Sequence, residues 1–312
     1  MVLARNEYAN WNGKEKLKML KFNLATRGWQ WVLGLGFGLL FFVIFSAFYG
    51  LWAYLRPPKI LSTTTPQDWG VEYEELILTT KDGYKLAAWF VLSPKKTDTA
   101  VILLHGYPAD KGDVLPSTIF LREDYNLLYL DFRYFGQSQG RYSTIGIKEV
   151  QDVRAAIDYL AQRGVQKVGL WGFSMGGAVG LMSLARSELV AAVVADSSYA
   201  SLPLMAEEVY RIVPGLNKII AKLMTQLVQR FLRLDLISDS PLTAVSQSKK
   251  PILLIHSRDD KVIPFGQAEL LQKALSKNPQ AEFWFRDDTL HGEAGSVEYQ
   301  RRLKEFFAKY LL

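Results

Sequence analysis

The stretch Val168–Gly180, VGLWGFSMGGAVG, constrains the fold of this chain more than any other segment. Its apolar beginning predicts a buried strand, and the small residues that follow Ser174 predict a helix. A serine in G-x-S-x-G between a strand and a helix lies on a sharp turn that exposes its hydroxyl at the edge of a sheet. The turn is so tight that Gly172 and Gly176 must lack side chains. We therefore predict that Ser174 is a nucleophile, against the alternative of a chance match in a chain with 23 glycines.

The strand pattern around this motif predicts an α/β fold. Two β-rich runs, 74–80 and 84–92, are joined by Lys-Asp-Gly, and Asp-Gly between such runs is typical of a hairpin. Six further runs are short and apolar, as parallel strands covered on both faces are: Ala100–Leu104, Leu127–Asp131, Val168–Trp171, Val190–Ala195, Ile252–Ile255 and Glu282–Phe285. Helices are expected between them, for example over Ile147–Arg163 and Gly176–Arg186. We expect one doubly wound, mostly parallel sheet.

A charge-free segment precedes this pattern. Residues 28–55 contain no charged side chain, and as a helix the part from Trp31 to Leu55 would span about 37 Å, enough to cross a bilayer. This apolar stretch is longer than the roughly 7–15 residues of a secretory signal. Aromatic residues suited to the membrane interface lie near both ends: Trp29, Trp31, Trp52 and Tyr54. Gly34 and Gly38 form one G-x-x-x-G, which favours weak self-association, although ordinary lipid-facing glycines are the alternative.

The charge distribution predicts how this anchor is oriented. Six lysines and arginines stand against two acids in residues 1–28, so +4 of the total +6 lies there, and the small remainder argues against a nucleic-acid surface. The positive-inside rule then places the N-terminus in the cytoplasm and the following domain outside the cytoplasm. The predicted order is a basic cytoplasmic tail (1–28), a transmembrane anchor (29–55), a linker (56–69) and one domain (70–312).

A serine nucleophile needs a base, and the chain has three histidines and no cysteine. His105 and His256 each follow a predicted strand, where a histidine more often supports a loop. His291 follows the last predicted strand, in a loop before the C-terminal helix, which is where this topology delivers a histidine to the carboxyl edge of the sheet. We therefore predict that His291 is the base.

A carboxylate should orient that base, and several are candidates. The chain order Ser, Asp, His favours the pair Asp259 and Asp260, which follows the penultimate strand, and we prefer Asp260. The alternatives are Asp196, which follows the preceding strand, and Asp287 and Asp288, which lie shortly before the histidine.

The tetrahedral intermediate also requires two N–H donors. One is expected from the backbone of Met175, directly after the nucleophile. The other is expected from the loop HGYPAD after the first apolar strand, where Tyr107 is the best placed.

These motifs together resemble the α/β-hydrolase superfamily, and closely its membrane-anchored bacterial members in the serine aminopeptidase-like group. The matching segments cover about residues 70–312: LHGYP at 104–108, DFRYFGQSQG at 131–140, GIKEVQDVRAAIDYL at 146–160, GFSMGG at 172–177, VADSSYA at 194–200, PILLIHSRDDKVIP at 251–264 and LHGE at 290–293. The resemblance implies that the aspartate two residues before Val-Ile-Pro, Asp260, is the acid. One departure is Tyr134, where such chains commonly carry glycine in a structural segment.

The resemblance also implies a small helical cap at about 201–246. Apolar residues recur there at helical spacing: Leu216, Ile219, Ile220, Leu223, Met224, Leu227, Val228, Phe231 and Leu232. This stripe indicates either a helix packed on its neighbours or a lid that lines an acyl pocket and touches lipid.

The resulting hypothesis is a membrane-tethered serine hydrolase that cleaves an ester or related acyl bond through an acyl-enzyme. Its partners would be a small-molecule or lipid-like acyl substrate and the membrane, with no nucleic acid, metal or organic cofactor. One alternative is a peptidase that removes N-terminal residues, which would need an acidic pocket built from the few acids of the cap: Glu207, Glu208, Asp235 and Asp239. Another is a non-catalytic binding protein of the same fold, but such proteins usually lose a triad member.

Overall fold

The sheet is eight-stranded and mostly parallel in this computed structural model, which describes residues 13–287, 290–292 and 295–312. Its strands are β1 Glu74–Thr79, β2 Lys85–Val91, β3 Thr99–Leu104, β4 Asn126–Leu130, β5 Lys167–Phe173, β6 Val190–Asp196, β7 Ile252–Ser257 and β8 Ala281–Arg286. Their spatial order is β1-β2-β4-β3-β5-β6-β7-β8. The β1–β2 hairpin and the β2–β4 pair are antiparallel, and the other neighbours are parallel. The predicted α/β fold class is confirmed.

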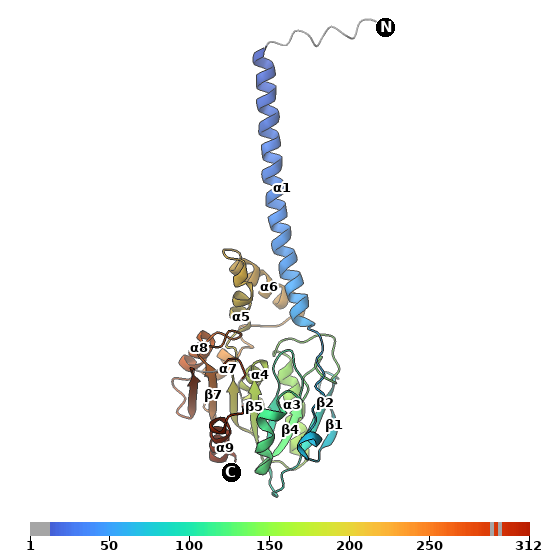
Figure 1. The fold of residues 1–312 in the computed structure, drawn as a ribbon, viewed down its shortest axis with the longest axis vertical. Helices are drawn as coiled ribbons and strands as arrows, with labels where there is room; N and C mark the ends of the chain where they lie inside the picture. Colours follow the sequence, from blue (N-terminus) through green and yellow to red (C-terminus); the bar gives the residue numbers. More distant parts are fainter. Residues whose placement is uncertain (1–12, 288–289, 293–294) are drawn as a thin grey trace.

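Helices cover both faces of the sheet (Figure 1). The α-helices are α1 Gly13–Leu55, α2 Leu115–Thr118, α3 Glu149–Gln162, α4 Met175–Ser183, α5 Leu202–Val209, α6 Asn217–Leu232, α7 Pro241–Ser246, α8 Gly266–Ala274 and α9 Val297–Leu311, and the 3₁₀ turns are Pro66–Trp69, Ile119–Glu123 and Tyr210–Ile212. Side chains of α3, α4, α7 and α8 share one apolar core, and those of α2 and α9 share the core on the other face.

Strand β3 explains why the apolar runs are continuous. Successive side chains of a strand point to opposite faces. Ile102 and Leu104 therefore enter the α3–α4 core, whereas Val101 and Leu103 enter the α9 core, and all four are fully buried. Burial on both faces removes the alternation of polar and apolar residues that a half-exposed strand shows.

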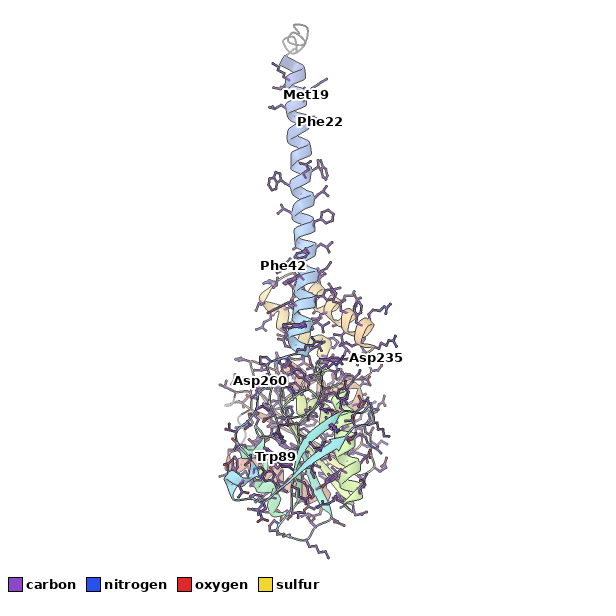
Figure 2. The ribbon with its side chains drawn as sticks, turned by 90° about the vertical axis from the view of Figure 1, so that its right-hand side faces the viewer. Met19, Phe22, Phe42, Trp89, Asp235 and Asp260 are labelled. Atoms are coloured by element: carbon purple, nitrogen blue, oxygen red, sulfur yellow. The ribbon has the colours of Figure 1, made fainter. Side chains whose placement is uncertain are left out.

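Helix α1 projects from the globular part as one continuous rod (Figure 1). Its segment Gly28–Leu55 is long and apolar enough to cross a membrane by length and composition, and among the described residues it is the one such helix. Most of its side chains are exposed, so it is not a core helix. Figure 2 shows side chains such as Met19 and Phe22 along the part of α1 far from the sheet.

The cap helices α5 and α6 lie beside the end of α1 nearest the sheet (Figure 1). Helix α6 contacts both α5 and α1. Its predicted apolar stripe is divided: Ile220 and Val228 are buried, whereas Ile219 and Phe231 are exposed. A Cβ atom added at Gly34 or Gly38 would have no neighbouring atom within 4 Å, so self-association through these two glycines stays a prediction.

Tyr134, the residue that departs from the family pattern, has φ +74°. This left-handed conformation suits glycine and is strained for other residues, which is why glycine is common there. Its hydroxyl donates a 2.6 Å hydrogen bond to the carbonyl of Pro57, and the Lys59 ammonium lies 5.4 Å from the centre of its ring. The tyrosine therefore holds the segment that follows α1 against the domain.

Candidate active site

Ser174 lies on the sharp turn between β5 and α4, as the motif predicts. Its backbone has φ +53° and ψ −114°, a strained conformation for a residue with a side chain. A Cβ atom at Gly172 would collide with the backbone of Gly176, and one at Gly176 would collide with the Leu104 carbonyl. The Ser174 N–H donates 2.8 Å to the Asp196 carbonyl at the end of β6. The two collisions explain why positions 172 and 176 must both be glycine.

His291 and Asp260 are joined directly. Nδ1 of His291 donates a 2.7 Å hydrogen bond to Oδ2 of Asp260, whose other oxygen accepts the N–H groups of Val262 and Ile263, both at 2.8 Å. Burial alone would raise the pKa of Asp260, but the His291 bond and the two backbone donors outweigh it, so the pKa lies below its usual value. The carboxylate is therefore ionised and fixed on both oxygens.

Phe173 lies between this pair and Ser174. The rings of Phe173 and His291 lie 4.8 Å apart between centres. Gly292 has φ +86°, and a Cβ atom there would lie 2.8 Å from the Phe173 ring. The loop carrying His291 thus packs on the residue immediately before Ser174. Ser174, Asp260 and His291 follow the carboxyl ends of the parallel strands β5, β7 and β8, so the three predicted triad residues share one edge of the sheet. Figure 2 labels Asp260 near the end of α1 closest to the sheet.

The other candidate acids have different environments. Asp259 is exposed, and Asp287 forms a 3.2 Å ion pair with Arg258 with its side chain mostly exposed. Asp196 is buried and accepts the Tyr299 hydroxyl at 2.8 Å, which in turn accepts the Trp171 indole N–H at 3.0 Å. Asp288 and Glu293 lie outside the described residues. The geometry therefore favours Asp260 as the partner of the histidine.

The other two histidines support loops. Nε2 of His105 accepts the Phe132 N–H at 3.1 Å, so Nδ1 carries the proton and donates 2.7 Å to the Gly106 carbonyl. His256 donates from Nε2 to the Ile263 carbonyl at 2.8 Å. Burial lowers the pKa of both rings, so both are neutral at pH 7.

The segments expected to supply the oxyanion donors lie next to Ser174. Met175 is the first residue of α4, so its N–H belongs to the positive end of that helix. Gly106 packs on Ser174, because a Cβ atom at position 106 would lie 3.4 Å from Cβ of the serine. This contact brings the loop that carries Tyr107 beside Ser174. The Tyr107 hydroxyl points elsewhere and donates 2.9 Å to the Tyr54 carbonyl in α1.

A cavity of about 220 Å³ opens at Ser174. Its walls are mostly apolar and come from α1, the loop 144–145, the cap and the Val262–Ile263 segment: Leu51, Tyr54, Leu55, Tyr107, Thr144, Ile145, Ser174, Met175, Tyr199, Leu202, Met205, Ala206, Val209, Met224, Thr225, Val228, Leu234, Leu236, Val262 and Ile263. None of these lining residues is acidic or basic. The three residues from α1 were not predicted, because the sequence assigns them to the membrane anchor and nothing local marks them as cavity residues.

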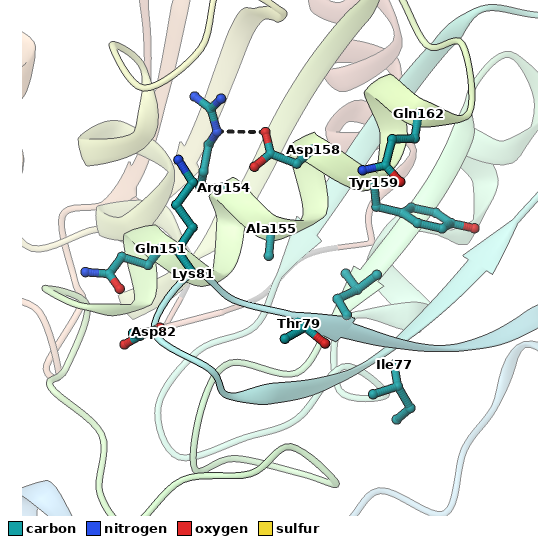
Figure 3. Close-up of a pocket in the computed structure, with 11 residues that line it drawn as sticks. Ile77, Thr79, Lys81, Asp82, Gln151, Arg154, Ala155, Asp158, Tyr159 and Gln162 are labelled. Carbon is teal, nitrogen blue, oxygen red and sulfur yellow. Dashed lines mark hydrogen bonds and ion pairs between the residues drawn. The ribbon is translucent and has the colours of Figure 1, made fainter.

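A larger hollow of about 560 Å³ lies between α3 and β1, which is an outermost strand of the sheet (Figure 3). Ion-paired side chains such as Arg154 and Asp158 line it, with a 2.8 Å contact between them. Ser174 does not line it, and it holds no nucleophile next to a base. Although this hollow is larger, the smaller cavity at Ser174 is therefore the better candidate for the active site.

The sheet order and the serine turn define an α/β-hydrolase. The family model described as alpha/beta hydrolase fold matches residues 99–240. The uncharacterized protein YfhR of Escherichia coli is 30% identical over 227 residues, covering 69% of this chain and 72% of that protein. The chain belongs to the alpha/beta hydrolase superfamily, and the comparisons identify it as a hydrolase.

Solved structures give the same assignment. The esterase Pf2001 of Pyrococcus furiosus superimposes with a TM-score of 0.68 and 27% identity, over 83% of this chain and 100% of that one. The acylaminoacyl peptidase of Pyrococcus horikoshii has a TM-score of 0.59 and 17% identity, over 77% of this chain and 42% of that one. At that identity, the second likeness concerns the fold alone.

Proposed function

We propose that this protein is a membrane-tethered serine hydrolase that cleaves an ester or related acyl bond through Ser174, His291 and Asp260. The observation that carries the proposal is the 2.7 Å bond from His291 to Asp260, in a loop packed against the residue before the strained serine. Backbone strain costs free energy and persists only where the surrounding fold offsets that cost. Such strained residues are typical of functional sites.

The proposed reaction follows from this geometry. Asp260 accepts Nδ1–H of His291 and thereby leaves Nε2 to take the proton of Ser174 as its oxygen attacks the acyl carbon. The N–H groups of Met175 and Tyr107 would stabilise the oxyanion. His291 then protonates the leaving alcohol, and water, activated by the same ring, hydrolyses the acyl-enzyme.

The cavity favours an acyl substrate over a peptide amine. A site that binds a substrate ammonium needs a carboxylate, because burying an unpaired charge is costly. The acids of the cap, Glu207, Glu208, Asp235 and Asp239, do not line the cavity. The apolar walls instead suit the alkyl chain of an ester, whose transfer from water contributes about 0.8 kcal/mol per methylene.

A fluorophosphonate probe tests the proposal on the full chain in detergent micelles. Wild type should be labelled and should hydrolyse p-nitrophenyl esters. Ser174→Ala should lose labelling and most of its turnover, whereas the exposed-serine control Ser276→Ala should retain both. Full labelling of Ser174→Ala would refute the mechanism, and faster turnover of aminoacyl amides than of esters would favour the peptidase alternative.

A further inference from the structure

The membrane anchor contributes directly to the cavity at the nucleophile. Leu51, Tyr54 and Leu55, all in the last two turns of α1, line the same cavity as Ser174. We infer that α1 is a specificity element as well as an anchor: its last turns form one wall of the site that binds the acyl chain of a membrane-resident ester. This inference rests on the proposed function. It adds where the acyl chain of the substrate binds and by which route it reaches the cavity.

The contact between α1 and the cap is close and specific. The Tyr210 hydroxyl donates 3.0 Å to the Ser46 carbonyl, in the middle of the contact between the two. Gly50 makes room for it, because a Cβ atom there would collide with that hydroxyl. One turn earlier, Ala47 is fully buried in a cluster with Ile220 of α6. These contacts hold α1 in one position against the cap.

The C-terminal end of α1 is also fixed to the hydrolase domain. The last carbonyls of a helix have no partner within it and need donors from elsewhere. Tyr107 donates to the Tyr54 carbonyl, and the Ser143 N–H donates 2.9 Å to the Leu55 carbonyl. The Tyr107 and Tyr54 rings also stack, with centres 6.3 Å apart. Since burial raises the pKa of Tyr107, its hydroxyl remains a donor over the physiological range.

Helix α6 contributes Met224, Thr225 and Val228 to the lining of the same cavity. The cavity is therefore bounded by α1, by the cap and by Ser174. Its volume of about 220 Å³ lies below the roughly 300–1,000 Å³ of sites for drug-sized ligands. That size and its apolar lining fit one acyl chain of medium length.

The exposed aromatic residues of α1 place this cavity at the level of the bilayer surface. Tyr49 and Trp52 are more than half exposed, although they lie in the turns of α1 that contact the cap. Trp29 and Trp31 mark the other end, at a helical distance of about 27–35 Å, which matches a bilayer core of about 30 Å. The contact at Gly50 thus lies at the lipid interface.

The outer face of α6 has the composition of an interfacial helix. Lys218, Lys222 and Arg230 are exposed beside Ile219 and Phe231, which are 55% and 67% exposed. Basic and apolar side chains together favour the headgroup region of a membrane. An acyl chain would therefore pass from the lipid into the cavity along α1 without crossing bulk water.

Variants at Leu51 test whether α1 forms part of the wall of the acyl-binding cavity. We would assay the full chain in nanodiscs with p-nitrophenyl butyrate, octanoate and dodecanoate. Leu51→Trp should reduce the free volume of the cavity and lower the ratio of kcat/KM for octanoate to kcat/KM for butyrate about tenfold or more. Leu51→Ala should move the preference toward dodecanoate, because each added buried methylene contributes about 0.8 kcal/mol. The matched control is Leu39→Trp, on an exposed part of the same helix outside the cavity.

Variants at Gly50 test whether the contact between α1 and the cap is needed for the chain-length preference. Gly50→Leu should displace α1 from Tyr210 and reduce the octanoate-to-butyrate ratio, while fluorophosphonate still labels Ser174. Gly38→Leu, at a position with free space around it, should leave the ratio unchanged. If the wild-type protein is not labelled by the fluorophosphonate and does not cleave esters, the proposed function fails. If the wild-type protein is labelled and cleaves esters but Leu51 and Gly50 variants keep its chain-length profile, the inference fails while the proposed function stands.

Discussion

The carboxylate of Asp260 accepts Nδ1–H of His291 at 2.7 Å, although the two residues are 31 positions apart. Its neighbour Asp259 is exposed and makes no such contact. The two aspartates are adjacent in sequence and chemically identical, so the difference between them is a sharp test of the site.

The first prediction concerns these two residues. Asp260→Asn should lower kcat on the order of 10⁴-fold, the loss that the same change causes in a serine protease triad, because the amide favours the wrong histidine tautomer. Asp259→Asn should change kcat by less than about threefold. Steady-state kinetics on one ester, with thermal unfolding to establish folding, measures both. Equal losses, or a larger loss at Asp259, would show that the carboxylate is misassigned.

The second prediction concerns Tyr134. Tyr134→Phe removes the hydrogen bond to Pro57 and should destabilise the contact by about 1 kcal/mol, making the segment after α1 more accessible to trypsin at Lys59. Tyr134→Gly also removes the ring that contacts Lys59 and Phe135, so trypsin should cleave at Lys59 at least as fast as in Tyr134→Phe. Tyr142→Phe, in the same loop region, is the control. Unchanged proteolysis in both Tyr134 variants would contradict this role.

The third prediction concerns pH. Burial lowers the pKa of His256 below 6.5, so below that pH the unfolded chain takes up a proton that the folded chain does not. The contribution of this ring to stability is complete above pH 6.5 and is lost as the pH falls toward its folded pKa, by up to about 1.4 kcal/mol per pH unit. Buried acids with a raised pKa, such as Asp196, act in the opposite direction. The informative quantity is therefore the difference in unfolding free energy between wild type and His256→Gln, measured at each pH.

That variant keeps an N–H donor for the Ile263 carbonyl but does not titrate. Denaturant unfolding at pH 7.5 and 5.5 should show that the unfolding free energy of wild type falls relative to that of His256→Gln, by up to about 1 kcal/mol, as the pH falls. A difference that is the same at both pH values would exclude a buried neutral histidine.

The fourth prediction concerns membrane orientation. The basic residues before the span should keep the N-terminus in the cytoplasm, so a reporter fused after Leu312 that requires export should be active. Changing Lys14, Lys16, Lys18 and Lys21 to Gln should make the orientation mixed. A reporter active only in the cytoplasm would reverse the proposed topology.

Several features of the molecule could be predicted from local sequence, because their physical causes are local. The serine turn requires glycine two residues before and after Ser174, and those glycines are visible in the sequence. The doubly buried strands show continuous apolar runs, and the length of the charge-free stretch at residues 28–55 indicates a membrane span. These features by themselves determined the fold class and the candidate nucleophile.

Other features depend on residues that are far apart in the chain. The family resemblance pointed to Asp260 rather than Asp259, but the physical reason is that the turn after β7 directs the Asp260 side chain toward His291, and residue type does not encode that direction. The apolar stripe of α6 could not be divided into a packed face and an exposed face until its neighbour α1 was placed. The role of Leu51, Tyr54 and Leu55 is likewise invisible locally, since apolar residues in an anchor serve lipid and cavity equally well. Only the tertiary structure decides it, because the contact of α1 with the cap at Gly50 and Tyr210 turns one face of α1 toward Ser174.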